Sequence, residues 1–344
     1  MSPAGEKRIR LKDIAQMVGV DLSLVSRVVN HNADGEISEA KRKKIEKIIR
    51  ETGYVPSSAA RSLATRKTRQ LMFIFSDNTL QGLANAYFGN MLHGFSDACA
   101  AHKYNCILNI LDCSDISAFV LPENLKNYSV DGCAIAGFAN HPLITHLDKK
   151  QHPVVMIEPS LFYEQIPIVN RKDRKEIPGL LDFFRRKKYR KVWMSEGFFQ
   201  PELLNIKDLE IKKIDDYKRE VEAVAEFFAG RVASLPEEKR PDLLVCRGHI
   251  ALHLLRKLKD HGLKCPEDIA LMSTSDFEAN QFCTPALSTV VQDSREMGRY
   301  AGELLYRICT GMISREAAVE EARNHQFPVQ IKERESTGSP VLSR

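Results

Sequence analysis

From residue 71 onward, short uninterrupted apolar runs alternate with stretches whose apolar residues recur at helical spacing. The apolar runs lie at 71–75, 106–111, 132–136, 154–157, 192–194, 243–246 and 269–272, and the helical patterns at 91–101, 177–187, 218–228 and 250–261. A strand that is apolar on both faces must be covered on both faces, which is typical of parallel sheets flanked by helices. The number of such strand–helix units favours two α/β sheets.

The first sixty residues have a different pattern, made of short helices. Residues 11–18 place apolar side chains at helical spacing, and Gly19 is the residue type best able to leave a helix at positive φ. Two more helices are predicted, over 22–30 after the capping residue Asp21 and over 39–52 after the capping residue Ser38. The sequence therefore predicts a helix, a tight turn and a helix, followed by a third helix.

The positive charge of the chain is concentrated at this end. Residues 1–70 contain 15 Lys and Arg against 8 Asp and Glu, a net charge of +7, so the remaining residues carry −2 of the total of +5. Three short helices with a basic surface match the helix-turn-helix architecture, in which the second helix reads base edges and cations contact phosphates. A Lys/Arg run alone would indicate only a solvated helix face, but the tight turn favours DNA binding.

Several motifs along the chain occur together in one known family. They are Leu11-Lys12-Asp13-Ile14-Ala15, Gly19-Val20-Asp21, Val25-Ser26-Arg27-Val28-Val29-Asn30, Gly53-Tyr54-Val55-Pro56, Ala60-Arg61-Ser62-Leu63, Asn85-Ala86-Tyr87-Phe88, Val130-Asp131-Gly132, Cys265-Pro266-Glu267-Asp268-Ile269-Ala270, Thr284-Pro285-Ala286-Leu287-Ser288-Thr289-Val290 and Arg295-Glu296-Met297-Gly298. With these motifs, the sequence resembles the lactose-repressor (LacI/GalR) family of bacterial transcription regulators. The resemblance is dense over residues 9–65 and extends over nearly the full length.

The resemblance implies a fold and a domain order. An N-terminal all-α helix-turn-helix headpiece is expected, followed by an α/β two-lobed sensor domain like the type I periplasmic binding proteins. The expected segments are 9–56 for the DNA-binding domain, 57–69 for a hinge helix and linker, 70–334 for the effector-binding and dimerisation domain, and 335–344 for a polar tail.

The resemblance also implies which residues contact DNA. The base-reading pair at the start of the second helix falls on Leu22 and Ser23, and a further base contact falls on Arg27. Arg27 is expected to matter most, because Arg can pair with both O6 and N7 of a guanine. A hinge helix beginning at Ser57 is expected to fold on DNA and to wedge Leu63 into the minor groove. The full expected set is Leu22, Ser23, Arg27, Asn30, Ser57, Arg61 and Leu63.

In the sensor region the sequence departs from sugar-responsive relatives. Ser275 stands where they often have a ligand-binding Asp, Arg247 replaces an amide, and the Arg usually found after the strand at 192–194 has no counterpart. Two interpretations remain open. Either the cleft binds a carbohydrate-derived or anionic small molecule, with Arg247 as counter-charge, or it has degenerated and the regulator works without an effector. The candidate effector contacts are Phe88, Glu158, Arg247, Asp276 and Gln292.

Other classes of protein fit the same sequence less well. No stretch is long and apolar enough for a membrane span, and no apolar signal-peptide core follows Met1, so a soluble cytoplasmic protein is expected rather than an exported ligand receptor. The eight cysteines include no CxxC pair and are expected to be reduced. His249 and His253 lack an evident third metal ligand, and an enzyme using Cys246 and His249 lacks a supporting motif. No catalytic residue, metal or cofactor is predicted.

The expected partners follow from the resemblance. A homodimer would place two headpieces on half-sites about one helical turn apart, so the double-stranded operator should be a near-palindrome. The tail from residue 335 shows no heptad pattern, which favours a dimer over a tetramer. We expect a repressor whose affinity for the operator changes when a small molecule binds between the lobes.

Overall fold

The computed structural model describes residues 9–29, 37–56, 62, 65, 67–76, 86–111, 120–136, 142–158, 163–169, 177–195, 210–214, 221–325 and 327–338. The chain divides into two compact units, Met1–Arg69 and Gln70–Arg344. In the described part, no helix is long and apolar enough to cross a membrane.

Three helices of the first unit have bounds within the described residues: α1 (Leu11–Val18), α2 (Leu22–Val29) and α3 (Glu39–Thr52). They share one small core, made of Ile14, Ala15, Val18, Val25, Val28 and Ile45. Gly19 follows α1 with φ of +74°, a left-handed conformation that glycine adopts without a steric cost, and this permits the tight turn into α2. The predicted helix-turn-helix arrangement is confirmed.

The ends of these helices differ in part from the expectation. Ser38 occupies the N-cap position of α3, as predicted, but its side chain makes no capping hydrogen bond. At α1, by contrast, the carboxylate of Asp13 accepts a hydrogen bond from the backbone N–H of Arg10 at 2.8 Å. An acidic side chain in the first turn also interacts favourably with the positive end of the helix dipole, so Asp13 stabilises the start of α1 in two ways.

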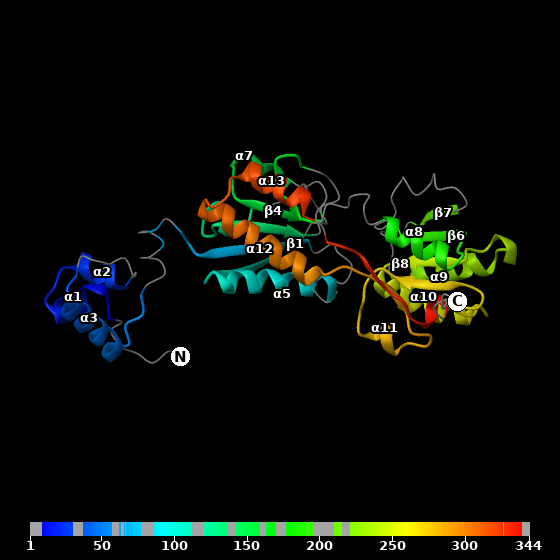
Figure 1. The fold of residues 1–344 in the computed structure, drawn as a ribbon, viewed down its shortest axis with the longest axis horizontal. Helices are drawn as coiled ribbons and strands as arrows, with labels where there is room; N and C mark the ends of the chain where they lie inside the picture. Colours follow the sequence, from blue (N-terminus) through cyan, green and yellow to red (C-terminus); the bar gives the residue numbers. More distant parts are fainter. Residues whose placement is uncertain are drawn as a thin grey trace. The chain divides into compact units, whose positions relative to one another are not determined.

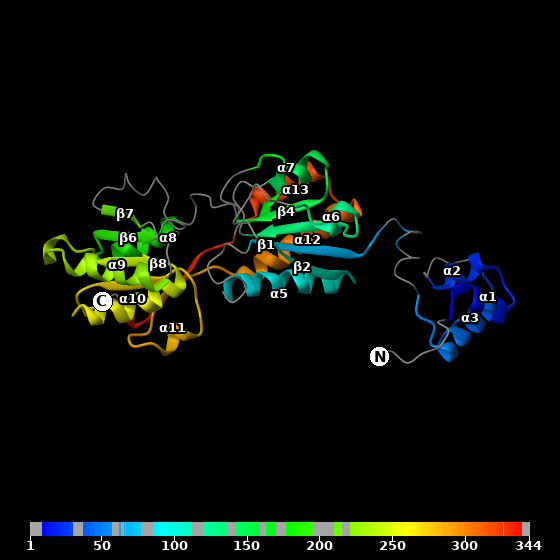
Figure 2. The ribbon, with the colours of Figure 1, turned by 180° about the vertical axis from the view of Figure 1, so that it is seen from behind.

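The second unit contains two sheets, and the first has the strand order β2-β1-β3-β4-β5 with parallel pairings throughout. Its strands are β1 (Gln70–Ser76), β2 (Asn105–Leu111), β3 (Gly132–Ala136), β4 (Val154–Ile157) and β5 (Ile168–Val169). One face packs against α5 (Ala86–Ala101), α12 (Ser294–Thr310) and α13 (Arg315–Asn324), and the other against α6 (Glu123–Lys126) and α7 (Pro142–Lys149). Figures 1 and 2 both show α5 and α12 side by side along this sheet.

The second sheet has the order β11-β10-β9-β8-β6-β7, and β11 is its antiparallel strand. Its strands are β6 (Lys191–Ser195), β7 (Glu210–Ile214), β8 (Leu243–Cys246), β9 (Ala270–Ser273), β10 (Ser288–Val291) and β11 (Gln330–Lys332). Helices α9 (Val221–Ala233) and α10 (Gly248–Asp260) cover one face and α8 (Ile177–Arg186) the other, while the short α11 (Ala279–Phe282) follows β9.

The chain passes between the two sheets more than once. It leaves the second sheet after β10 to form α12 and α13 on the first, and it returns as β11. The last described element, a short turn of helix at Glu335–Thr337, packs back onto β9 and β10. This connectivity confirms the two-lobed α/β architecture.

The strands that sequence patterning missed are short or polar. β5 has two residues, and β10 begins with the polar pair Ser288 and Thr289 although it lies inside its sheet. β7 and β11 carry the charged sequences EIKKI and QIK at the edges of their sheet. Edge strands need cover on fewer sides, so their sequences do not show the continuous apolar run of a central strand. Of the helix predicted at 218–228, residues 221–228 lie in α9, which continues to Ala233, and residues 218–220 lie outside the described residues.

Candidate nucleic-acid interface and ligand cavity

The first turn of α2 is the exposed part of the predicted DNA-reading helix. Leu22 is 50% exposed and Ser23 is also exposed, although Leu22 is a large apolar residue. Arg27, one turn after Ser23 on the same side of the helix, is half-buried. The three predicted base-reading residues that the structure describes therefore lie along one accessible strip of α2.

The opposite side of α2 holds the strip in place. Val25 and Val28 are buried against Ile14 and Ile45 from the other two helices. Because each helix contributes to one shared core, α2 cannot rotate to bury Leu22 without moving Val28 out of that core. In the same unit, the Lys44 ammonium donates a hydrogen bond to the backbone carbonyl of Val18 at 3.1 Å, which connects the end of α1 to α3.

Part of the basic surface of α3 is neutralised within the helix. Arg42 pairs with Glu46 at 3.1 Å, and Lys47 pairs with Glu51 at 3.7 Å. These are exposed pairs one turn apart, which contribute only a few tenths of a kcal/mol. Four residues of the expected DNA-binding set lie outside the described residues: Asn30, Ser57, Arg61 and Leu63.

The second unit contains a cavity of about 490 Å³ near the start of α12. Its wall is formed by the start of α5, the loop after β9, the end of β10 with the start of α12, and the segment that leads into β11. Two of the predicted effector contacts, Asp276 and Gln292, line this cavity. Phe88, Glu158 and Arg247 do not belong to its lining.

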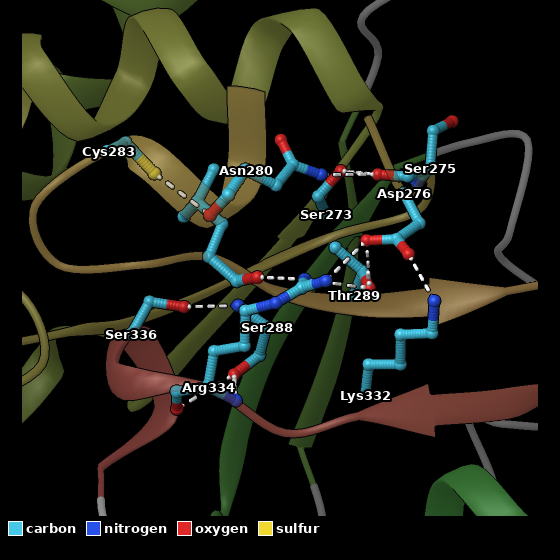
Figure 3. Close-up of polar contacts among 11 residues, drawn as sticks. Ser273, Ser275, Asp276, Asn280, Cys283, Ser288, Thr289, Lys332, Arg334 and Ser336 are labelled. Carbon is cyan, nitrogen blue, oxygen red and sulfur yellow. Dashed lines mark hydrogen bonds and ion pairs between the residues drawn. The ribbon is translucent and has the colours of Figure 1, made fainter. Parts of the chain in front are cut away.

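Asp276 is held by cations from the β11 segment. Its carboxylate accepts hydrogen bonds from Lys332 Nζ at 2.6 Å, from Arg334 at 2.8 Å and from the Thr289 hydroxyl at 3.1 Å. Figure 3 shows Lys332 and Arg334 both pointing toward this carboxylate. Sequence patterning missed these two cations, because they lie more than fifty residues further along the chain and only the pairing of β10 with β11 brings them to Asp276.

The Asp276 carboxyl group stays ionised in this setting. Partial burial on its own would raise the pKa of Asp276, but the hydrogen bonds from Lys332 and Arg334 outweigh burial and hold the pKa below its ordinary value. Asp276 and Arg334 are only 14% and 16% exposed, whereas Lys332 is 52% exposed. The pair formed by Asp276 and Arg334 is therefore the buried part of the cluster, and Lys332 is its accessible part.

Glu158 and Phe88 lie behind the cavity wall rather than in it. The Tyr87 hydroxyl, which belongs to a cavity-lining residue, donates a hydrogen bond to Glu158. Glu158 has φ of +48°, a left-handed conformation that costs a non-glycine residue about 1 kcal/mol or more. Phe88 packs edge-on against Phe75, with ring centroids 4.7 Å apart. Both residues thus position Tyr87 and its helix.

Arg247 lies at the N-cap position of α10, one residue after β8. The next residue, Gly248, is required by close packing, since a Cβ there would lie 2.1 Å from the ring of Phe277. His249 packs against the same ring at an interplanar angle of 33°, with ring centroids 4.3 Å apart, and burial lowers the pKa of His249. Phe277 therefore fills the space beside the first turn of α10.

Metal-binding groups and cysteine thiols were the other candidate functional features of the sequence. The described ranges contain no group of three or more His, Cys, Asp and Glu side chains arranged to hold a metal ion. Seven of the cysteines are described, and each of these is a free thiol that is buried or half-buried.

Comparison with known proteins gives matches to both units. The family model for bacterial regulatory proteins of the lacI family matches residues 10–57, and the model for a periplasmic binding protein-like domain matches residues 186–337. Catabolite control protein A of Priestia megaterium is 26% identical over 96% of this chain and 99% of its own length. The HTH-type transcriptional regulator KdgR of Bacillus subtilis (strain 168) is 26% identical over 88% of this chain and 91% of its own length.

Solved structures match over nearly the whole chain. The lac repressor dimer bound to operator and the anti-inducer ONPF aligns with a TM-score of 0.74 at 19% identity, covering 97% of this chain and 100% of that one. The complex of the transcriptional regulator CelR with cellobiose aligns with a TM-score of 0.63 at 22% identity, covering 96% and 100%. At these identities the structural matches establish the fold.

Proposed function

Because the chain belongs to the lacI family of bacterial regulatory proteins, we propose that it binds a specific DNA operator as a homodimer and that a small molecule bound in its second unit changes the affinity for that operator. It is a DNA-binding regulator of transcription. The observation that carries the DNA-binding part of the proposal is the accessible strip of Leu22, Ser23 and half-buried Arg27, held outward by the buried core of the first unit.

The strip suits direct reading of base pairs. The Arg27 guanidinium can donate two hydrogen bonds to one guanine, Leu22 can contact a thymine methyl group, and the Ser23 hydroxyl can bond to several bases. Leu63 is proposed as a minor-groove wedge that bends the operator. Because DNA is the partner, we place the protein in the cytoplasm of a bacterium, and its chemistry is binding without turnover.

The test is sequence preference in solution. Sites selected from random DNA by the purified full-length protein should converge on a near-palindrome, with half-sites about one helical turn apart. Binding to that site should resist non-specific competitor DNA. A protein that retains no preferred sequence, even at low salt, would exclude the proposed function.

Dimerisation is proposed through β2, at the edge of the first sheet. β2 is the outer strand of that sheet in the described part of the chain, and Leu108 and Ile110 on it are 40% and 50% exposed. An unprotected edge strand with exposed apolar side chains is a site for pairing with another chain. The substitution Ile110→Asp should shift the protein from dimer to monomer in analytical ultracentrifugation and weaken operator binding. An unchanged dimer would place the interface elsewhere.

The cavity favours a regulator that responds to a small molecule. Its volume of about 490 Å³ lies within the usual range for small-molecule sites, and its lining combines aromatic rings with amide and hydroxyl groups. Ligand binding there would alter operator affinity through a linkage of about 1–3 kcal/mol. The relatives and solved structures named above include regulators in complex with small molecules, such as CelR with cellobiose.

A further inference from the structure

Two of the described cysteines, Cys99 and Cys106, lie in contact with each other. Cys99 belongs to the last turn of α5, and Cys106 is the second residue of β2, on the other side of the short turn that joins the two elements. The backbone N–H of Tyr104 donates to the carbonyl of Cys99 at 2.8 Å, which closes this turn. Both cysteine side chains pack into the same apolar cluster, and their sulfurs share a hydrogen bond.

Other described thiols face different partners. The thiols of Cys265, Cys283 and Cys309 donate to backbone carbonyl oxygens at 3.3–3.6 Å. Cys133 belongs to the apolar cluster on the opposite face of the first sheet. A carbonyl oxygen cannot form a bond with a thiol on oxidation, whereas two neighbouring sulfurs can form a disulfide. The contact between α5 and β2 is therefore suited to redox chemistry.

The two thiols of this pair differ in acidity and in access. Cys99 is 1% exposed, whereas Cys106 is half-buried on a strand at the edge of its sheet. The hydrogen bond from the Cys99 thiol stabilises the Cys106 thiolate and lowers the pKa of Cys106, while the same contact together with burial raises the pKa of Cys99. Peroxides react with accessible thiolates. Cys106 is therefore the sulfur that an oxidant meets first, and Cys99 is the neighbouring thiol that can complete a disulfide.

We propose that Cys99 and Cys106 form a disulfide in response to hydrogen peroxide and that this disulfide weakens the pairing of two copies through β2. The Cys106 thiolate attacks the peroxide, breaks the O–O bond and becomes a sulfenic acid, with loss of hydroxide. The Cys99 sulfur then displaces the sulfenic hydroxyl group, which leaves with the Cys99 proton as water. In total, two thiols are oxidised to one disulfide, and one hydrogen peroxide is reduced to two waters.

Formation of the disulfide should move β2 rather than α5. An S–S bond is about 2.05 Å long, much shorter than a hydrogen bond between two sulfurs, so the two elements must approach each other. Close packing on α12 holds α5, since a Cβ on Gly94 would lie 1.8 Å from the carbonyl oxygen of Arg295. Among the described strands, β2 pairs with β1 alone, so its outer side leaves it room to shift.

A shift of β2 reaches the proposed dimer contact directly. Cys106, Leu108 and Ile110 lie on one face of the strand, because successive side chains alternate between faces. Leu108 and Ile110 are the exposed apolar residues of this face, and a movement toward α5 displaces them from the position in which they meet the partner. The inference rests on the proposed function, because it names a regulation of the proposed dimer. Since two linked headpieces bind an operator more tightly than one, oxidation should also weaken operator binding.

The test compares the full-length protein before and after treatment with hydrogen peroxide under native conditions. Thiols titrated after denaturation should fall from eight to six, and a dithiol reductant should restore them. Trypsin cuts after Lys103, so the disulfide should link peptide 70–103 to peptide 104–126. In analytical ultracentrifugation, the dissociation constant of the dimer should rise about tenfold or more, and the affinity for the selected operator should fall, both reversibly.

Variants assign the response to the two sulfurs. Cys106→Ser and Cys99→Ala should each keep their dimerisation and operator binding unchanged when peroxide is added. Cys265→Ser is the matched control, since Cys265 is also a half-buried thiol but lies in the part of the chain that forms the second sheet. It should respond to peroxide like the wild type. Cys113 lies in peptide 104–126 and outside the described residues, and Cys113→Ser should likewise respond like the wild type.

The proposal is overturned if peroxide leaves all eight thiols, if Cys113→Ser abolishes the cross-link, or if the oxidised protein dimerises as tightly as the reduced protein. DNA binding separates this inference from the proposed function. If oxidation weakens the dimer but the reduced protein shows no preferred DNA sequence, the regulatory function fails and the redox site stands. If the reduced protein selects a near-palindrome and oxidation leaves the dimer unchanged, the opposite conclusion holds.

Discussion

Gly298 and Gly94 lie where α12 and α5 are in closest contact. A Cβ on Gly298 would lie 1.9 Å from the carbonyl oxygen of Met91, and a Cβ on Gly94 would lie 1.8 Å from that of Arg295. Both neighbours are backbone atoms, which cannot rotate away as a flexible side chain can. The substitution Gly298→Ala therefore forces the two helices apart by about 1 Å or more.

The magnitude follows from two opposing effects. Overpacking costs about 1–3 kcal/mol, and the upper end applies here because the backbone must move. Replacing glycine by alanine within a helix raises the free energy of unfolding by about 1 kcal/mol, which offsets part of this cost. The net loss of unfolding free energy for Gly298→Ala is therefore about 2 kcal/mol. Since α12 begins beside the cavity at Arg295 and Glu296, the displacement should also alter the cavity wall.

The assay is urea unfolding followed by far-ultraviolet circular dichroism, with hydrogen exchange to locate the change in α5 and α12. Gly179→Ala is the control, because Gly179 lies in α8 and a Cβ added there would meet no atom within 4 Å. That variant should be as stable as the wild type or more stable by up to about 1 kcal/mol. If Gly298→Ala were as stable as Gly179→Ala, the close approach of the two helices would be wrong.

Two further predictions concern the DNA-reading strip and the buried ion pair. Arg27→Ala should weaken binding to the selected operator by about 1–3 kcal/mol and weaken non-specific binding far less, as measured by fluorescence anisotropy; equal losses on both DNAs would contradict base reading by Arg27. Asp276→Asn should destabilise the second unit by about 2 kcal/mol at neutral pH, because it leaves the largely buried Arg334 without its carboxylate. The pKa of Asp276 is lowered in the folded state, so its contribution to stability is fully present above the unfolded pKa of about 3.9 and is lost as the pH falls through the folded pKa. The difference in unfolding free energy between wild type and Asp276→Asn should therefore be constant from pH ~8 to ~5 and should narrow in acid. If this difference in unfolding free energy stayed the same in acid, ionised Asp276 would not be the origin of the stabilisation.

Local patterns were sufficient for the first unit. Apolar spacing in residues 11–18 and the glycine at position 19 predict α1 and the turn after it, and both are confirmed. Short helices with one apolar face have few ways to share a core, so sequence alone settles their arrangement.

Strands with a continuous apolar run were equally predictable, including the edge strand β2, whereas β5, β7, β11 and the central strand β10 were missed. Residues 132–136, 154–157 and 243–246 are strands as predicted, since only a strand covered on both faces is apolar throughout. β7 and β11 carry charged residues and were missed. Their identity as strands depends on the neighbour to which they pair, which no local pattern contains.

At the cavity, too, the sequence predicted some features and the tertiary structure alone decided others. Residue types and the family resemblance single out Asp276 and Gln292, both of which line the cavity. The sequence contains nothing to indicate that Asp276 is already paired with Arg334 and Lys332, or that Arg247 lies three strands away from them. The sequence determines which chemical groups are present. The charge around a site depends on which of these groups lie close together, and residues remote in sequence are brought together only when the strands pair.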